Sequence, residues 1–102
     1  MIVHMVLLRV RCNVLMKDVE RVFAAFGGLR QKIPGITGYS WGAYASPEGL
    51  NRGYTHAFCM GFQSAALRDA YLAHPEHQKV VNLAMGVIEG GLEGVLTFDY
   101  AA

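Results

Sequence analysis

The segment 2–10 constrains the fold more than any other part of the chain, because it is a strand pattern that is apolar on both faces. One alternation carries Ile2, His4, Val6, Leu8 and Val10, and the other carries Val3, Met5, Leu7 and Arg9. Successive side chains of a strand point to opposite faces of its sheet, so both faces of this strand need cover. We therefore expect a layered protein in which this strand lies inside the sheet.

The remaining strands and the first helix follow from the same kind of pattern. Apolar residues recur at helical spacing from about Lys17 to Gln31, which predicts an amphipathic helix. Strands are predicted for 36–44, 54–62 and 95–100, where aromatic and β-branched residues gather. The segment 45–53 is rich in Pro, Gly and Asn, so we expect it to be the loop between the first two of these strands.

The second helical region is interrupted by a proline. Ser64 is a predicted N-cap for a short helix that runs through Ala73. Pro75 suits the first position of a further helix, which we expect to run to about Glu89 before two glycines stop it. His74 then precedes that helix, and we favour a capping role for it.

The predicted order is therefore β-α-β-β-α-β with a broken second helix, which is the ferredoxin-like α+β arrangement. Its helices cover one face of the sheet only. The other face would carry Val3, Met5, Leu7 and Cys59, and it is too apolar to remain in water. We expect a homodimer in which two sheets face each other, with an interface on the order of 2,000 Å² or more.

Length and composition exclude several classes of protein. The 102 residues suit one domain, spanning 1–102. With nine Lys and Arg against eight Asp and Glu, the net charge of +1 predicts no nucleic-acid partner. No apolar run is long enough for a membrane helix, and the start lacks a signal-peptide pattern. The two cysteines have no CxxC spacing, so we expect reduced thiols and a cytoplasmic location. No Cys or carboxylate cluster completes a ligand set and no glycine-rich phosphate loop occurs, so we expect neither a structural metal nor a cofactor, while a loosely bound divalent cation stays open.

Four short motifs resemble those of a known family. They are His4 in the first strand, "GYTH" at 53–56, "YLAHPEH" at 71–77 and "FDY" at 98–100. Together they resemble the stress-responsive A/B barrel (Dabb) family along essentially the whole chain. The resemblance implies a dimeric α+β barrel.

The same resemblance implies a set of site residues. The chain is most similar to the polyketide cyclases of that family, which close a linear polyketide by an intramolecular aldol condensation without a cofactor. Their general base matches His77 and their pocket tyrosine matches Tyr71, while His4, His56 and Asp99 match residues near the cavity. The implied cavity walls are Val6, Leu8, Phe23, Phe26, Phe58, Met60 and Val95.

The chemistry of these residue types fits such a reaction. An aldol closure needs a base that titrates near neutrality, a donor for the developing oxyanion and a dry cavity. His77 and Tyr71 can supply the base and the donor, and Asp99 can fix the tautomer of a nearby histidine. We therefore expect a small, largely apolar carbonyl compound as the ligand.

Two alternatives to this function stay open. His4, His56, His77 and Tyr71 also suit a purely structural role in a core. In the first alternative, the chain is a non-catalytic dimer that sequesters a ligand or serves stress tolerance. A cofactor-free oxygenase is a third function, by analogy of fold alone.

Overall fold

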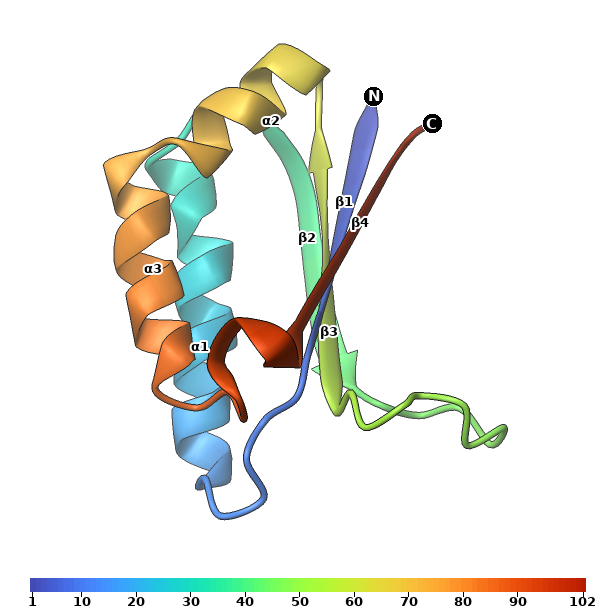
Figure 1. Ribbon diagram of the computed structural model, residues 1–102. Helices are drawn as coiled ribbons and strands as arrows, with labels where there is room; N and C mark the ends of the chain where they lie inside the picture. The colour runs from blue at the N-terminus through green and yellow to red at the C-terminus, as the bar shows by residue number, and fades with distance from the viewer.

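The computed structural model describes residues 1–102 as a four-stranded antiparallel sheet with helices on one face (Figure 1). The strand order is β2-β3-β1-β4, so the strand that is apolar on both faces lies inside the sheet, as predicted. The ferredoxin-like α+β fold expected from the sequence is thereby confirmed. The elements are β1 (Ile2–Leu8), α1 (Met16–Gly28), η1 (Leu29–Gln31), β2 (Ile36–Ala43), β3 (His56–Phe62), α2 (Ala65–Leu72), α3 (Pro75–Met85), η2 (Gly91–Gly94) and β4 (Val95–Ala101).

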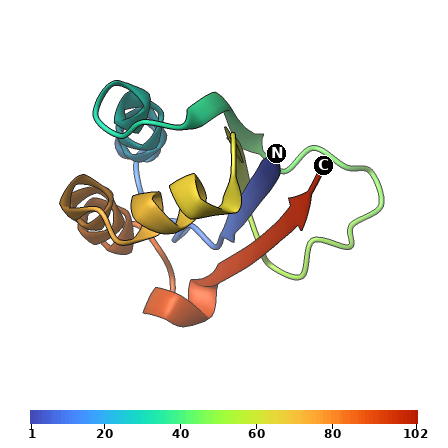
Figure 2. The ribbon, with the colours of Figure 1, turned by 90° about the horizontal axis from the view of Figure 1, so that it is seen from above.

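The helices form one layer against the sheet. α1 buries Val19, Val22, Phe23 and Phe26, whose spacing of three and four residues makes a single stripe. α1 and α3 run side by side, and α2 crosses near one end of the strands (Figures 1 and 2). None of these helices combines the length and hydropathy that a membrane crossing requires.

The break in the second helical region lies where the sequence predicts it. The Ser64 side chain accepts a hydrogen bond from the Leu67 backbone N–H at 3.2 Å and caps α2. His74 Nδ1 accepts a hydrogen bond from the Glu76 N–H at 3.1 Å, and Pro75 begins α3. The capping role expected for His74 is confirmed. The break also turns the chain between Tyr71 and His77, so α2 and α3 meet at an angle (Figure 1).

Three predicted boundaries are wrong. β1 ends at Leu8 and not at Val10, β3 begins at His56 and not at Tyr54, and α3 ends at Met85 rather than near Glu89. One cause accounts for the first and the last of these differences. The chain after β1 pairs with the chain after α3, through bonds from the Arg11 N–H to the Val87 carbonyl and from the Glu89 N–H to the Arg9 carbonyl.

The two faces of the sheet have different surroundings. On β1, the side chains of His4, Val6 and Leu8 are buried beneath the helices. The alternate positions face away from the helices, and their Cα partners on β4 are Tyr100, Phe98 and Leu96. In the single chain Phe98 is 63% exposed, and Leu96 and Tyr100 are 46% and 48% exposed. We call this surface, made by Val3, Met5, Leu7, Ala57, Cys59, Leu96, Phe98 and Tyr100, the open face.

Candidate functional site

An apolar cavity of about 180 Å³ lies between the helix-covered face of the sheet and α3. Eleven of its fourteen lining residues are hydrophobic, and the other three are His4, His77 and Thr97. Its walls include five of the seven that the resemblance implies. The hydrophobic lining consists of Val6, Leu8, Phe26, Phe58 and Val95, together with Leu72, Val81, Ala84, Met85, Ile88 and Leu92.

Five residues expected at this cavity do not line it: Phe23, Met60 and His56, together with Tyr71 and Asp99, which are described below. Phe23 stacks on Trp41, with ring centroids 4.5 Å apart and planes within 3°. Met60 is fully buried in the core. His56 also lies near Phe23, at 5.8 Å between centroids, and lines a separate groove of about 510 Å³ along α1 and β2. His56 and His77 therefore line different hollows.

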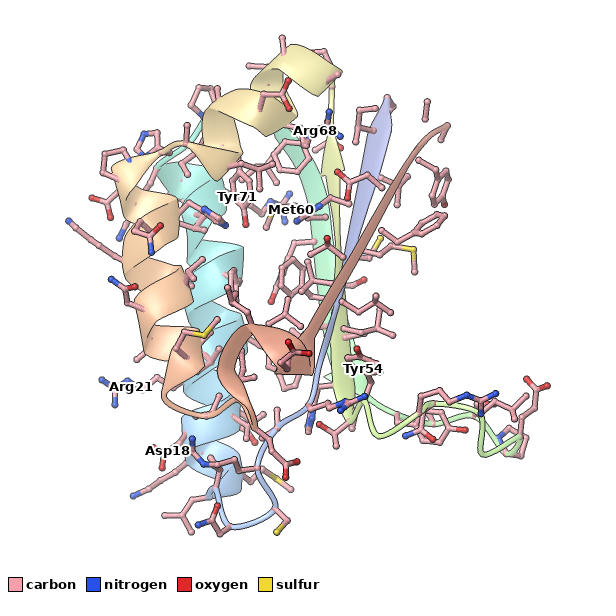
Figure 3. The ribbon with its side chains drawn as sticks, in the orientation of Figure 1. Asp18, Arg21, Tyr54, Met60, Arg68 and Tyr71 are labelled. Carbon is pink, nitrogen blue, oxygen red and sulfur yellow. The ribbon has the colours of Figure 1, made fainter.

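Tyr71 and His77 meet across the break between α2 and α3. Their ring centroids are 4.4 Å apart, and Tyr71 is fully buried. Figure 3 shows Tyr71 pointing from α2 into the space between the helices and the sheet. Tyr71 does not itself line the cavity, but it lies directly behind His77, which does. The Tyr71 hydroxyl and His77 Nδ1 are both buried and have no hydrogen-bond partner within the protein.

Burial sets the protonation states of this pair. It lowers the pKa of His77, an effect that the nearby Leu72 backbone carbonyl opposes, although no hydrogen bond of good geometry joins the two. A positive charge on His4 would lower the pKa of His77 further. Burial also raises the pKa of the Tyr71 hydroxyl. At neutral pH the imidazole is therefore neutral and the phenol is protonated. This is the combination of a proton acceptor and a hydrogen-bond donor that acid–base chemistry needs.

A second group of polar side chains surrounds His4. His4 Nδ1 lies 2.6 Å from Asp99 Oδ1, and Arg68 Nη1 donates to Asp99 Oδ2 at 2.9 Å. Burial would raise the pKa of Asp99, but its hydrogen bonds to His4 and Arg68 outweigh burial, and the pKa is lowered. The expected contact between Asp99 and a histidine is present, with His4 as the partner. Asp99 lies behind His4 and does not line the cavity.

Arg68 is the residue of this group that the sequence interpretation missed. Its position on α2, three residues before Tyr71, puts both side chains on one helix face. Both lie on the side of α2 that faces the strands in Figure 3. That spacing was the signal by which Arg68 could have been found.

The thiols of Cys12 and Cys59 are free, and no three His, Cys, Asp or Glu side chains form a group suited to a metal ion.

The fold and the site together define a class: a ferredoxin-like α+β protein with an apolar open face and, beneath its helices, an apolar cavity lined by two histidines. The family model of the stress responsive A/B barrel domain (Dabb) matches residues 2–102. The chain therefore belongs to this family.

Its relatives include proteins with different activities. Olivetolic acid cyclase from Cannabis sativa is 26% identical over 98 residues, which cover 95% of this chain and 92% of the cyclase. A dimeric ferredoxin-like protein of unknown function from Jannaschia sp. CCS1 is 27% identical, with a TM-score of 0.88 and coverage of 99% and 98% of the two chains. The hydroxynitrile lyase from Passiflora edulis is 22% identical, with a TM-score of 0.84 and coverage of 97% and 90%, a likeness of fold alone.

Proposed function

We propose that the protein binds a small, largely apolar carbonyl compound in the cavity beneath α3 and acts on it by cofactor-free acid–base chemistry. The observation that carries this proposal is the contact between His77 and Tyr71 beside an apolar cavity, with a free polar atom on each ring. Buried polar atoms are normally hydrogen-bonded, so each exception needs an explanation, and a catalytic role is one of these explanations. The likeness to olivetolic acid cyclase supports the same class of chemistry.

In the proposed reaction, His77 accepts a proton from the carbon next to the ligand carbonyl. The electron pair of that C–H bond moves to the carbonyl oxygen and forms an enolate. Tyr71, which lies behind His77, donates a hydrogen bond to the oxygen that gains charge, and this step requires the His77 ring to move so that the ligand reaches the hydroxyl. The enolate carbon then attacks a second carbonyl of the same molecule, which forms a C–C bond. The resulting alkoxide takes up the proton that His77 holds, and this regenerates the neutral imidazole. No redox partner is required.

The cavity restricts the ligand to a small one. Pockets for drug-sized ligands usually measure about 300–1,000 Å³, whereas this cavity measures about 180 Å³. Its lining is apolar except for His4, His77 and Thr97. A compact ketone with few polar groups suits these walls better than a long or charged substrate.

Exchange of α-protons tests the chemistry without knowledge of the natural substrate. Cyclohexanone and acetophenone are small apolar ketones, and proton NMR in D₂O follows the loss of their α-proton signals. The protein should accelerate exchange above the buffer rate. His77→Ala should remove most of the acceleration, since a general base contributes about 100-fold or more. Lys79→Ala, an exposed change on the same helix, is the matched control. Absence of both exchange and ligand-induced shifts would reject the proposal.

A non-catalytic protein that holds a small carbonyl ligand is the second candidate. The complete burial of Tyr71, away from the lining of the cavity, favours it. Ligand-induced shifts at cavity residues without any α-proton exchange would support this candidate over the first.

The proposed assembly is a homodimer formed through the open face. Large apolar side chains at Leu96, Phe98 and Tyr100 are unusual on a surface that stays in water. The relative from Jannaschia sp. CCS1 is described as dimeric, which supports the same arrangement here. Light scattering should give twice the chain mass of 11.2 kDa. A stable monomer at micromolar concentration would contradict it. The cytoplasmic location stays a prediction.

A further inference from the structure

We infer that Arg68 is a positioning residue that acts through Asp99 on His4, and that it makes His4 a second proton acceptor of the cavity. The Asp99 carboxylate bridges the two side chains, with Oδ1 at 2.6 Å from His4 Nδ1 and Oδ2 at 2.9 Å from Arg68 Nη1. The positioning of His4 stands on this geometry alone. The role of His4 as a proton acceptor rests on the proposed function.

The three side chains of this hydrogen-bonded group come from three different elements. His4 on β1 and Asp99 on β4 are directly opposed in the antiparallel register, so the sheet itself brings them together. Arg68 reaches Asp99 from α2, and its Nε also bonds Asp69 Oδ1 at 2.9 Å, which orients the guanidinium. Arg68 is mostly buried, with 21% of its side chain exposed. The geometry of a group held by three elements is more constrained than that of an ion pair between two long surface side chains.

The bridge fixes the tautomer of His4. A guanidinium does not lose its proton in proteins, so Arg68 holds Asp99 in the ionised state. An ionised carboxylate only accepts hydrogen bonds, so the neutral His4 ring must carry its proton on Nδ1. The lone pair is then on Nε2, the ring nitrogen that Asp99 does not occupy. His4 lines the cavity from the sheet side, while His77 lines it from α3.

Two proton acceptors would therefore face one ligand from opposite sides. When His4 Nε2 takes a proton from a ligand C–H or O–H, the electron pair stays on the ligand as an enolate or alkoxide. The imidazolium that forms is stabilised by the Asp99 carboxylate already bonded to it. The proton returns to the product or to water, so the step needs no further reactant.

The tautomer of His4 is the direct test, and it needs no ligand. Long-range ¹⁵N–¹H correlations of the His4 ring, recorded above the usual range of imidazole titration, should show a protonated Nδ1 and a bare Nε2 in the wild type. Arg68→Met should give a mixture of both tautomers, and Arg68→Lys should restore the wild-type pattern. Arg21→Met is the matched control, since Arg21 is an exposed arginine on α1, far from α2 in Figure 3.

The second readout is α-proton exchange of the same ketones. Arg68→Met should lower the rate about tenfold, by analogy with metal-bound histidines, for which loss of an outer hydrogen-bond partner costs about 10–100-fold. Arg68→Lys should recover most of the rate, and Arg21→Met should not change it. If Arg68→Met fails to fold, Arg68→Gln replaces it, with the same expected change of tautomer.

The outcomes separate the two proposals. A wild-type tautomer of His4 in Arg68→Met overturns the positioning role, whatever the exchange rate. A changed tautomer with an unchanged exchange rate overturns the role of His4 as a proton acceptor. If the wild-type protein exchanges no ketone, the proposed function fails and the acceptor role fails with it, but the tautomer still decides whether Arg68 positions His4.

Discussion

Replacing Tyr71 with Phe should leave the protein as stable as the wild type or make it more stable. The Tyr71 hydroxyl is fully buried and has no partner within the protein, whereas the Tyr39 hydroxyl donates to the Phe23 carbonyl at 2.6 Å. An unpaired buried polar group costs about 1–3 kcal/mol, and an ordinary hydrogen bond contributes about 0.5–1.5 kcal/mol. We expect Tyr71→Phe to raise the free energy of unfolding by up to about 1 kcal/mol. Tyr39→Phe should lower it by about 1 kcal/mol.

Urea unfolding at one fixed protein concentration measures both changes, and fixed concentration matters because a dimer gains stability with concentration. In thermal melts, 1 kcal/mol corresponds to roughly 4 °C or more for a domain of this size. The same Tyr71→Phe variant should lose ketone exchange, so stability and activity would move in opposite directions. If Tyr71→Phe destabilises as much as Tyr39→Phe, the hydroxyl is engaged within the folded protein and is not free to act on a ligand.

Three further results are expected. His74→Ala should lower the free energy of unfolding by about 0.5–2 kcal/mol through loss of a helix cap, with ketone exchange unchanged; a selective loss of exchange would contradict the separate roles of His74 and His77. Because burial lowers the pKa of His77 in the folded protein, stability should be full above about pH 6.5, the usual histidine value, and should fall as the pH drops from there toward the lowered pKa. His77→Gln should reduce the slope of that part of a urea-midpoint profile against pH, and the remaining slope belongs to His56, whose pKa is also lowered by burial. An unchanged slope would contradict the shift of His77. Phe98→Asp should give a monomer by light scattering, while Met16→Asp, an equally exposed apolar position on α1, should not.

The fold could be predicted because it depends on periodicity, which a sequence displays directly. The double-sided apolar pattern of β1 required cover on both faces, and Pro75 required a break in the second helical region. The end of α3 could not be predicted in this way. Residues 87–89 continue an acceptable helical pattern, but they pair instead with the chain after β1, a contact between segments more than 70 residues apart.

The types of residue at the site were predicted, but which of them lie together in the cavity and which pair with one another was not. Alternation along β4 puts Asp99 on the side of the histidines, yet only the cross-strand register selects His4 as its partner. His56 lines the groove beside Trp41 and not the cavity of His77, and this difference depends on where α1 lies over β2. Arg68 was missed because a charged residue on a short helix reads as a surface residue until its distant acceptor is known.

The position of β4 at the edge of the sheet has a thermodynamic consequence. Along this strand Phe98 belongs to the open face, while its neighbours Thr97 and Asp99 belong to the side of the cavity. A displacement of the strand therefore changes both faces together. If pairing of two chains and occupancy of the cavity favour different positions of β4, the two equilibria are linked, and each must alter the other by the same factor. Ligand affinity would then vary with protein concentration, and a titration at several concentrations would give the coupling free energy directly.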